Sequence, residues 1–202
     1  MFESYDRVDT IKYFNGFSTT PALEYVVLNN ISDFQPKMSS HLLTEICLCT
    51  EGSGFFQIDN DRIPFKKGDV IIINPYVLHG SGASEKETLQ YYILGVKNIQ
   101  FASPDEDFKC LYHLNGNRLP SYVDLLWGEI KDTFDGSRIS IVRNLLTIIL
   151  TELKCITSTN VIPFSKKETS IMADSVAQYI NRHFTKKSLW TNWQKYSSAR
   201  RV

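Results

Sequence analysis

The fold of this chain is decided between Glu51 and His79, where the sequence reads EGSGFFQIDNDRIPFKKGDVIIINPYVLH. Turn signals at Gly52 to Gly54, at Asn60-Asp61 and at Gly68-Asp69 separate short apolar runs. Strands this close together must pair antiparallel, because a parallel pair needs a crossover of about a dozen residues or more. The stretch therefore predicts half of a small antiparallel β-barrel.

The same pattern continues on both sides of this stretch. Seven runs are rich in β-branched and aromatic residues and are bounded by turn residues. They are Leu23–Leu28, Thr44–Thr50, Phe55–Asp59, Arg62–Phe65, Val70–Asn74, Leu89–Val96 and Lys109–Leu114. We therefore expect a mainly β chain, with a barrel over residues 1–115.

Beyond Pro120 the apolar residues recur at helical spacing, which predicts one helix up to Phe134 and a second over Arg138–Ile156. The second helix is apolar over an arc too wide for one contact. We expect the barrel or the preceding helix to cover one side and the same helix of a second subunit to cover the other. Full burial within one subunit is the alternative. The predicted dimer interface consists of Val142, Leu145, Leu146, Ile149 and Leu153.

These patterns divide the chain after the barrel. Residues 116–157 are predicted to be a helical dimerisation segment, and polar residues with Pro163 predict a linker over residues 158–167. Residues 166–202 carry eight Lys and Arg against two acidic residues, whereas residues 1–165 carry 14 against 20. This basic end is compatible with an anionic partner or with a solvated, Lys-rich surface.

Composition excludes some classes of protein. The 202 residues are 43% hydrophobic, and no apolar run approaches the roughly 20 residues that span a bilayer. The first residues do not resemble a signal peptide, so we expect a cytoplasmic protein with no membrane partner. Four cysteines are predicted to be buried free thiols, because a metal site at Cys47 and Cys49 would lack two further ligands.

Short motifs in this chain resemble a known family. Glu51 to Gly54, Gly68-Asp69 and Pro75 to His79 are similar to the turns of the cupin-type sensor domain of AraC-type transcriptional regulators. The strand at Tyr91 to Gly95 and the run from Tyr179 to Phe184, which is similar to the first helix of the family's helix-turn-helix domain, extend the resemblance. It covers nearly the whole chain up to Leu189.

The resemblance implies a jelly-roll barrel that binds a small effector, a homodimer, and promoter binding by helix-turn-helix units. Residues 168–188 would be the first helix of that DNA-binding domain, and residues 189–202 form a tail unlike the family. Promoter DNA is thus a partner of full-length family members and is not expected for this chain. We expect no enzyme activity and no cofactor.

The tail has a possible origin in its codons. If the possible codons of Trp190 to Lys195 are read from one base earlier, they can encode the sequence Leu-Asp-Glu-Leu-Ala-Lys. That sequence resembles the second helix of the family's DNA-binding domain. We therefore expect a one-base frameshift just after Ser188, in the gene, in cloning or in sequencing. A naturally short protein is the alternative. DNA sequencing past the stop codon would find a helix-turn-helix reading frame if the frameshift is real.

His41, Glu45 and His79 are the candidate site residues, because metal-binding cupins use two or three His and one Glu inside the barrel. Ser39 stands where the usual first histidine would be. Three roles remain open: polar groups facing an effector, hydrogen-bonded structural groups, or the metal ligands of a small cupin enzyme. We assign all three to ligand binding, without a metal.

The strand that begins at Leu89 contributes one more candidate. Alternation separates Tyr91 from Tyr92 without showing which points inward, and we assign Tyr92 to the ligand-binding set. Such aromatic and amide side chains suit a neutral ligand such as a sugar. The sequence contains no nucleophile motif or phosphate-binding glycine loop, so no catalytic residue is assigned.

Overall fold

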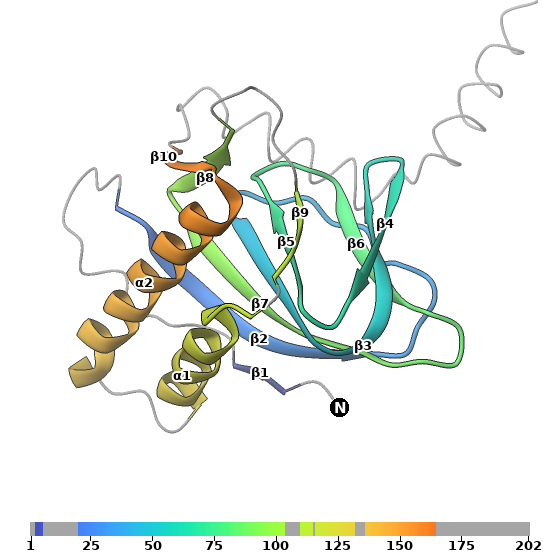
Figure 1. Cartoon of the computed structure of the whole chain (residues 1–202), viewed down its shortest axis with the longest axis horizontal. Coiled ribbons are helices and arrows are strands. Elements are labelled where there is room, and N and C mark those ends of the chain that lie inside the picture. The colour runs from blue at the N-terminus through green and yellow to red at the C-terminus, as the bar shows by residue number, and fades with distance from the viewer. Residues whose placement is uncertain (1–2, 6–19, 104–109, 115, 132–135, 165–202) are drawn as a thin grey trace, which may run out of the picture. The chain divides into compact units, whose positions relative to one another are not determined.

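The strands of this protein pair antiparallel around one long strand. The computed structural model describes residues 3–5, 20–103, 110–114, 116–131 and 136–164 (Figure 1). Its strands are β1 (Glu3–Tyr5), β2 (Ala22–Ile31), β3 (Thr44–Ile58), β4 (Asp61–Lys66), β5 (Asp69–Ile73), β6 (His79–Ala83), β7 (Leu89–Lys97), β8 (Ile99–Ala102), β9 (Leu111–His113) and β10 (Asn160–Pro163). Its helices are α1 (Leu119–Lys131) and α2 (Ile139–Thr157), after a 3₁₀ turn at Gly136–Arg138. The prediction of a mainly β chain with C-terminal helices is confirmed.

The long strand β3 belongs to two parts of the sheet. Its first half pairs with β5 and β7, and its second half pairs with β4 and β6. The change occurs at a bulge between Cys49 and Glu51 and at Gly52, where φ is 76°. A Cβ on Gly52 would lie 1.8 Å from the carbonyl oxygen of Thr88, so a larger residue does not fit. The two strands predicted on either side of this turn are therefore one bent strand.

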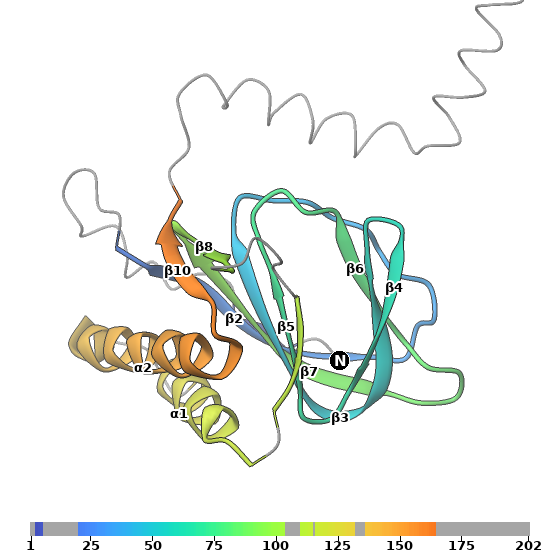
Figure 2. The same cartoon turned by 45° about the horizontal axis from the view of Figure 1, so that its top comes forward.

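The larger part of the sheet, with the order β1-β2-β7-β3-β5-β9, is buried on both faces. Because consecutive side chains of a strand alternate, Cys47 points into the barrel and Ile46 points to the opposite face. The barrel interior holds an aromatic cluster of Phe56, Phe65 and Tyr91, with ring centroids 5.0 to 5.8 Å apart. The opposite face packs against α1 and α2 (Figures 1 and 2).

Helix α2 uses its apolar side inside the monomer. Val142, Leu146, Ile149 and Leu153 are at most 5% exposed and pack with the sheet and α1, and Leu145 is half-buried against the same cluster. The prediction that these side chains form a dimer interface is therefore wrong for the four buried residues. The alternative of burial within one subunit applies to them, because the sheet and α1 together cover the wide apolar arc.

The chain returns to the sheet after α2. The helix ends at Ser158, which has a left-handed φ of 54°, and β10 then pairs with β8 (Figure 2). Thr159 is 3% exposed, and the backbone N–H of Phe164 donates to the carbonyl of Asn98 at 2.9 Å. Residues 158–164 are therefore part of the folded unit and not of a linker. The local sequence does not predict this, because β10 forms only by pairing with the distant strand β8.

The chain divides into two units, residues 1–165 and 166–202. The predicted first DNA-binding helix at residues 168–188, its His183, and the tail at residues 189–202 lie outside the described residues. Among the helices that the structure describes, none is long and apolar enough to span a membrane.

Candidate ligand-binding site

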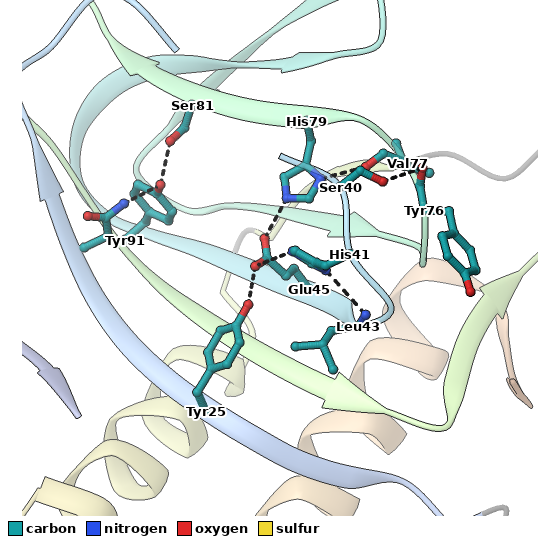
Figure 3. A network of polar contacts seen from close by, with 11 residues as sticks. Tyr25, Ser40, His41, Leu43, Glu45, Tyr76, Val77, His79, Ser81 and Tyr91 are labelled. Carbon is teal, nitrogen blue, oxygen red and sulfur yellow. Dashed lines mark hydrogen bonds and ion pairs between the residues drawn. The ribbon is translucent and has the colours of Figure 1, made fainter. Parts of the chain in front are cut away.

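Glu45 lies inside the barrel, on the face of β3 that also carries Cys47. The residue is 8% exposed, and three side chains converge on its carboxylate (Figure 3). His41 comes from the loop before β3, His79 is the first residue of β6, and Tyr25 lies on β2. The fold thus brings together the three residues that the sequence singled out and adds Tyr25.

Both carboxylate oxygens of Glu45 accept hydrogen bonds. Nε2 of His41 lies 3.0 Å from Oε1, and Nε2 of His79 lies 3.1 Å from Oε2. The Tyr25 hydroxyl donates to Oε1 as well. Within the described part of the chain, Oε2 has one donor and Oε1 has two. A carboxylate oxygen has two lone pairs, so Oε2 keeps one acceptor position for a ligand.

The contacts of His79 require a charged imidazolium ring. Its Nδ1 lies 2.8 Å from the carbonyl oxygen of Val77, which can only accept, so Nδ1 carries a proton. Its Nε2 faces the Glu45 carboxylate and needs a proton too. Burial lowers the pKa of His79, but the hydrogen bond and charge of Glu45 raise it more, so the net shift is upward from 6.5. His79 and Glu45 form a buried ion pair.

His41 contacts the other carboxylate oxygen of Glu45. Its Nδ1 accepts weakly from the backbone N–H of Leu43 at 3.4 Å, which leaves Nε2 as the donor to Glu45. Burial raises the pKa of Glu45, but the hydrogen bonds from His41 and His79 and the charge of His79 outweigh it and hold the pKa far below its usual range. The centre of the site is therefore a carboxylate at neutral pH.

Tyr25 is the site residue that the sequence did not reveal. A bulge in β2 between Leu23 and Tyr25 shifts the alternation, so Leu23 joins the helix-facing cluster while Tyr25 points into the barrel. The ring lies over Gly95, where an added Cβ would be 2.5 Å from the ring. Burial and the nearby Glu45 raise the pKa of Tyr25, so its hydroxyl stays protonated and donates.

We expect Tyr25→Phe to lower the free energy of unfolding by about 2 kcal/mol, because it removes a buried hydrogen bond to a charged acceptor. Tyr92→Phe is the matched control, because the Tyr92 hydroxyl bonds to the exposed Asp124 and its loss should cost less than about 1 kcal/mol. Urea denaturation monitored by tryptophan fluorescence measures both. Equal losses in the two variants would show that the Tyr25 hydroxyl does not support Glu45.

A cavity of about 230 Å³ opens beside this cluster. Glu45 and His79 line one part of it, and Ile31, Phe56 and Ile93 supply an apolar part. Three further lining residues on the barrel strands, Asn29, Ser81 and Tyr91, form a second polar cluster, and Gly80 of β6 also lines the cavity.

The second polar cluster is centred on the Tyr91 hydroxyl. Nδ2 of Asn29 donates to it at 2.6 Å. Oγ of Ser81 lies 2.6 Å from it, as Figure 3 shows. Burial is the main reason why the pKa of Tyr91 is raised, so the hydroxyl remains neutral. Neutral donors and acceptors therefore line one part of the cavity, and the ion pair of Glu45 and His79 lines another.

Tyr92, which the sequence analysis placed in the ligand-binding set, lies elsewhere. Its ring packs against Trp127 of α1, with centroids 5.9 Å apart, on the helix-facing side of β7. Tyr91 lines the cavity instead. The assignment of Tyr92 is corrected because the buried helices make both faces of this strand apolar, so alternation alone could not identify the inward face.

The histidine cluster also has the geometry of a metal site. One ligand atom each from His41, Glu45 and His79 lie within 4.8 Å of one another. Two imidazoles and one carboxylate suit iron and similar metals, and the Val77 carbonyl orients His79 as outer-shell partners of metal ligands do. These residues therefore fit a divalent transition metal.

His113 and the cysteines are not part of the cavity lining. His113 donates through Nδ1 to the buried Asp69 at 2.6 Å and ties β9 to the first residue of β5. Cys47 and Cys49 are buried free thiols, as predicted, and Cys110 is half-buried. Cys155 is exposed on α2, contrary to the prediction.

Residues 30–128 match the model of the AraC-like ligand binding domain. The described part of the chain is mostly β, with a jelly-roll-like sheet and two C-terminal helices. The match contains His41, Glu45 and His79, whereas Tyr25 and Asn29 precede it. The polar side chains that β2 contributes to the site therefore come from outside the matched residues, whereas its apolar Ile31 lies inside them.

Solved structures similar to this chain include several cupins. A cupin protein from Bacteroides fragilis is 21% identical, with 46% of this chain and 75% of that chain covered and a TM-score of 0.37. A predicted oxalate decarboxylase from Thermotoga maritima is 17% identical (37% and 67% covered, TM-score 0.35). A cupin 2 conserved barrel domain protein from Salinispora arenicola is also 17% identical (46% and 74% covered, TM-score 0.35). No protein with curated annotation matches the chain in sequence.

Proposed function

We propose that this chain is the effector-sensing part of a bacterial AraC-type transcription regulator. The match to an AraC-like ligand binding domain supports a small-molecule effector. The observation that carries the proposal is the cavity next to Glu45, because its polar clusters leave hydrogen-bonding positions that a bound molecule can use. In this proposal the effector controls promoter binding by a helix-turn-helix domain, and the protein works in the cytoplasm.

We favour sensing over catalysis because Glu45 and His79 already form an ion pair with each other. A general base needs a pKa near the working pH. The pKa of Glu45 is far below that range, and the ring of His79 has both N–H groups engaged. Neither side chain is therefore ready to take a proton from a substrate at neutral pH.

A chain of contacts links the site to the end of the folded unit. The backbone N–H of Tyr76 donates to the carbonyl of His41 at 2.8 Å, and the Tyr76 ring meets the Phe164 ring with centroids 5.9 Å apart. Phe164 directly follows β10 and is the last described residue before the second unit. A shift of His41 on ligand binding would therefore change the contact between Tyr76 and Phe164, at the point where the chain leaves the barrel.

The sensing proposal predicts a stabilising ligand. A compound present at about one hundred times its Kd adds about 2.7 kcal/mol to the free energy of unfolding, or roughly 5–10 °C in Tm. A thermal-shift screen of sugars and other small metabolites measures this. Ser81→Ala should reduce the shift, whereas Ser140→Ala on the exposed side of α2 should leave it unchanged. A ligand that stabilises both variants equally would bind outside the cavity.

A small metal-dependent cupin enzyme is the second candidate, favoured by the cluster of His41, Glu45 and His79. In that case the three side chains would hold a transition metal, which would supply Lewis-acid or redox chemistry. Metal analysis of the purified chain separates the two proposals. A stoichiometric metal that is lost in His79→Ala would favour the enzyme, and its absence in metal-supplemented preparations would favour the sensor.

We also propose a homodimer, through a different surface of the helices from the one predicted. The exposed large hydrophobic side chains of the helices are Leu125 on α1 and Ile141 and Ile148 on α2, which are 57%, 46% and 40% exposed. Ile141 and Ile148 are seven residues apart, so they lie on one side of α2. This solvent-facing side replaces the buried stripe as the proposed interface.

A further inference from the structure

One wall of the cavity is a segment without regular secondary structure, Asp33–Ser39, which we call the strap. Four of its side chains line the cavity, namely those of Asp33, Gln35, Lys37 and Ser39. They alternate along the chain, as expected for a nearly extended segment. All four are polar, and the strap therefore adds two charges and two neutral polar groups to the site.

The strap presents polar side chains to the cavity, where Asp33, Gln35, Lys37 and Ser39 remain exposed to solvent, and its apolar side chains lie outside the cavity. Phe34 is 42% exposed and Met38 is 39% exposed, and neither lines the cavity. A segment that only covered a barrel core would have the opposite pattern, with its apolar side chains inward. The strap therefore offers charged and hydrogen-bonding groups that a molecule in the cavity can reach.

The strap is also fixed in place. The backbone N–H of Ala83 donates to the carbonyl of Asp33 at 2.9 Å, and Ser39 exchanges two backbone hydrogen bonds with His79 at 2.7 and 2.9 Å. Added Cβ atoms at Gly80 and Gly82 would lie 2.8 and 2.7 Å from strap carbonyl oxygens, so these glycines allow the close approach. The strap is therefore a preorganised wall.

An aromatic contact holds the outer side of the strap. The Arg62 guanidinium lies 3.9 Å from the ring centroid of Phe55 and 5.0 Å from that of Phe34. The two rings meet edge to face, with centroids 5.6 Å apart. Phe34 therefore has a reason to face outward that does not involve the cavity, and its neighbours Asp33 and Gln35 point inward as a consequence.

The charges around the cavity sum to zero. Glu45 and His79 neutralise each other as a buried pair. Asp33 and Lys37 have no ion-pair or side-chain hydrogen-bond partner among the residues that the structure describes. A ligand with a single charge could pair with only one of these two and would leave the other without a partner. A ligand with one positive and one negative group could pair with both.

We propose that the strap determines ligand specificity and that the cavity takes a small zwitterion, with its cationic group at Asp33 and its anionic group at Lys37. The proposal rests on the sensing function proposed above and names its ligand class. A cavity of about 230 Å³ has the volume of about eight liquid water molecules. The ligand therefore has on the order of ten non-hydrogen atoms, the size of a small amino acid.

A thermal-shift panel on the full chain tests the ligand class. The zwitterions are β-alanine, γ-aminobutyrate and the α-amino acids of this size. The singly charged analogues γ-hydroxybutyrate and γ-aminobutyramide differ from γ-aminobutyrate in one group each, and polyols and pentoses serve as uncharged compounds. We expect at least one zwitterion to raise Tm at millimolar concentration, and its singly charged analogues to raise it much less.

Charge-removing variants then test the strap. With the stabilising zwitterion, Asp33→Asn and Lys37→Gln should each weaken the Kd from calorimetry by about fivefold, because each removes one partly exposed ion pair. Glu85→Gln and Lys154→Gln are matched controls, since these exposed residues lie away from the cavity lining and should leave the Kd unchanged. Strap variants that bind the zwitterion as tightly as the parent would overturn the role of the strap.

The possible results distinguish this inference from the sensing function. If an uncharged or singly charged compound is the stabilising ligand, and its effect is lost in Ser81→Ala, sensing stands and the zwitterion proposal is wrong. If no compound of any class stabilises the chain at millimolar concentration, both proposals fail.

Discussion

Replacing Glu45 by alanine is expected to lower the free energy of unfolding by about 3–5 kcal/mol. The change leaves the buried imidazolium of His79 without its counter-charge and removes the acceptor of Tyr25 and His41. Breaking a buried pair by removing one partner costs about this much. Denaturation in guanidinium chloride, followed by circular dichroism, measures the loss.

A milder variant keeps the test informative if the alanine variant does not fold. Glu45→Gln preserves the shape of the side chain and removes only its charge, so we expect a smaller loss of about 2 kcal/mol. Glu85→Gln removes a carboxylate from an exposed turn and should change stability by less than about 0.5 kcal/mol. A loss in Glu45→Gln no larger than in Glu85→Gln would contradict the buried ion pair.

The ion pair also predicts how stability depends on pH. Glu45 has a lowered pKa, so its contribution is present above its unfolded value of about 4.3 and is lost as pH falls through the folded pKa. His79 has a raised pKa, so its contribution is complete below about pH 6.5 and is lost as pH rises through the folded value. The pair therefore stabilises most between about pH 4.3 and 6.5. Glu45→Gln should flatten this maximum.

Leu146→Ala is expected to lower the free energy of unfolding by about 2–5 kcal/mol. Leu146 is 3% exposed between α2 and the sheet, so its truncation leaves a cavity in the monomer core. Ile148, two residues later and 40% exposed, is the matched control, and Ile148→Ala should cost less than about 1 kcal/mol in the monomer. Urea denaturation at low protein concentration compares the two.

Two other substitutions at the same positions test the proposed dimer surface. Ile148→Lys should shift the chain towards monomers in light scattering, because it places a charge in the proposed interface. A conservative Leu146→Met exchange should leave the oligomeric state unchanged, because that side chain is inside the monomer. A dimer that survives Ile148→Lys would exclude this side of α2 as the interface.

Most strands and both helices could be predicted from local pattern, because their periodicity and turn residues are local properties. β6 was missed because His79–Ala83 is rich in glycine and serine. The structure explains this composition: Gly80 and Gly82 let the strap approach the strand closely. β8 and β10 were missed because four-residue strands become visible only through their partner.

Only part of the site could be predicted from the sequence, because the other residues are placed by contacts between distant segments. His41, Glu45 and His79 stand out as residue types in a recognisable pattern, and the fold brings them together. Tyr25 and Tyr91 do not stand out, because a bulge in β2 and burial on both faces of β7 decide which tyrosines point inward. Such features depend on neighbouring strands.

The sequence by itself determined the antiparallel barrel, and the stretch from Glu51 to His79 was enough for this because its turns are local. Only the tertiary structure decided which face of each strand and helix is inside. That choice depends on packing between segments far apart in the chain: α1 and the sheet bury the α2 stripe, and β2 brings Tyr25 to Glu45. The strap opposite Glu45 was decided in the same way, by its contacts with β6.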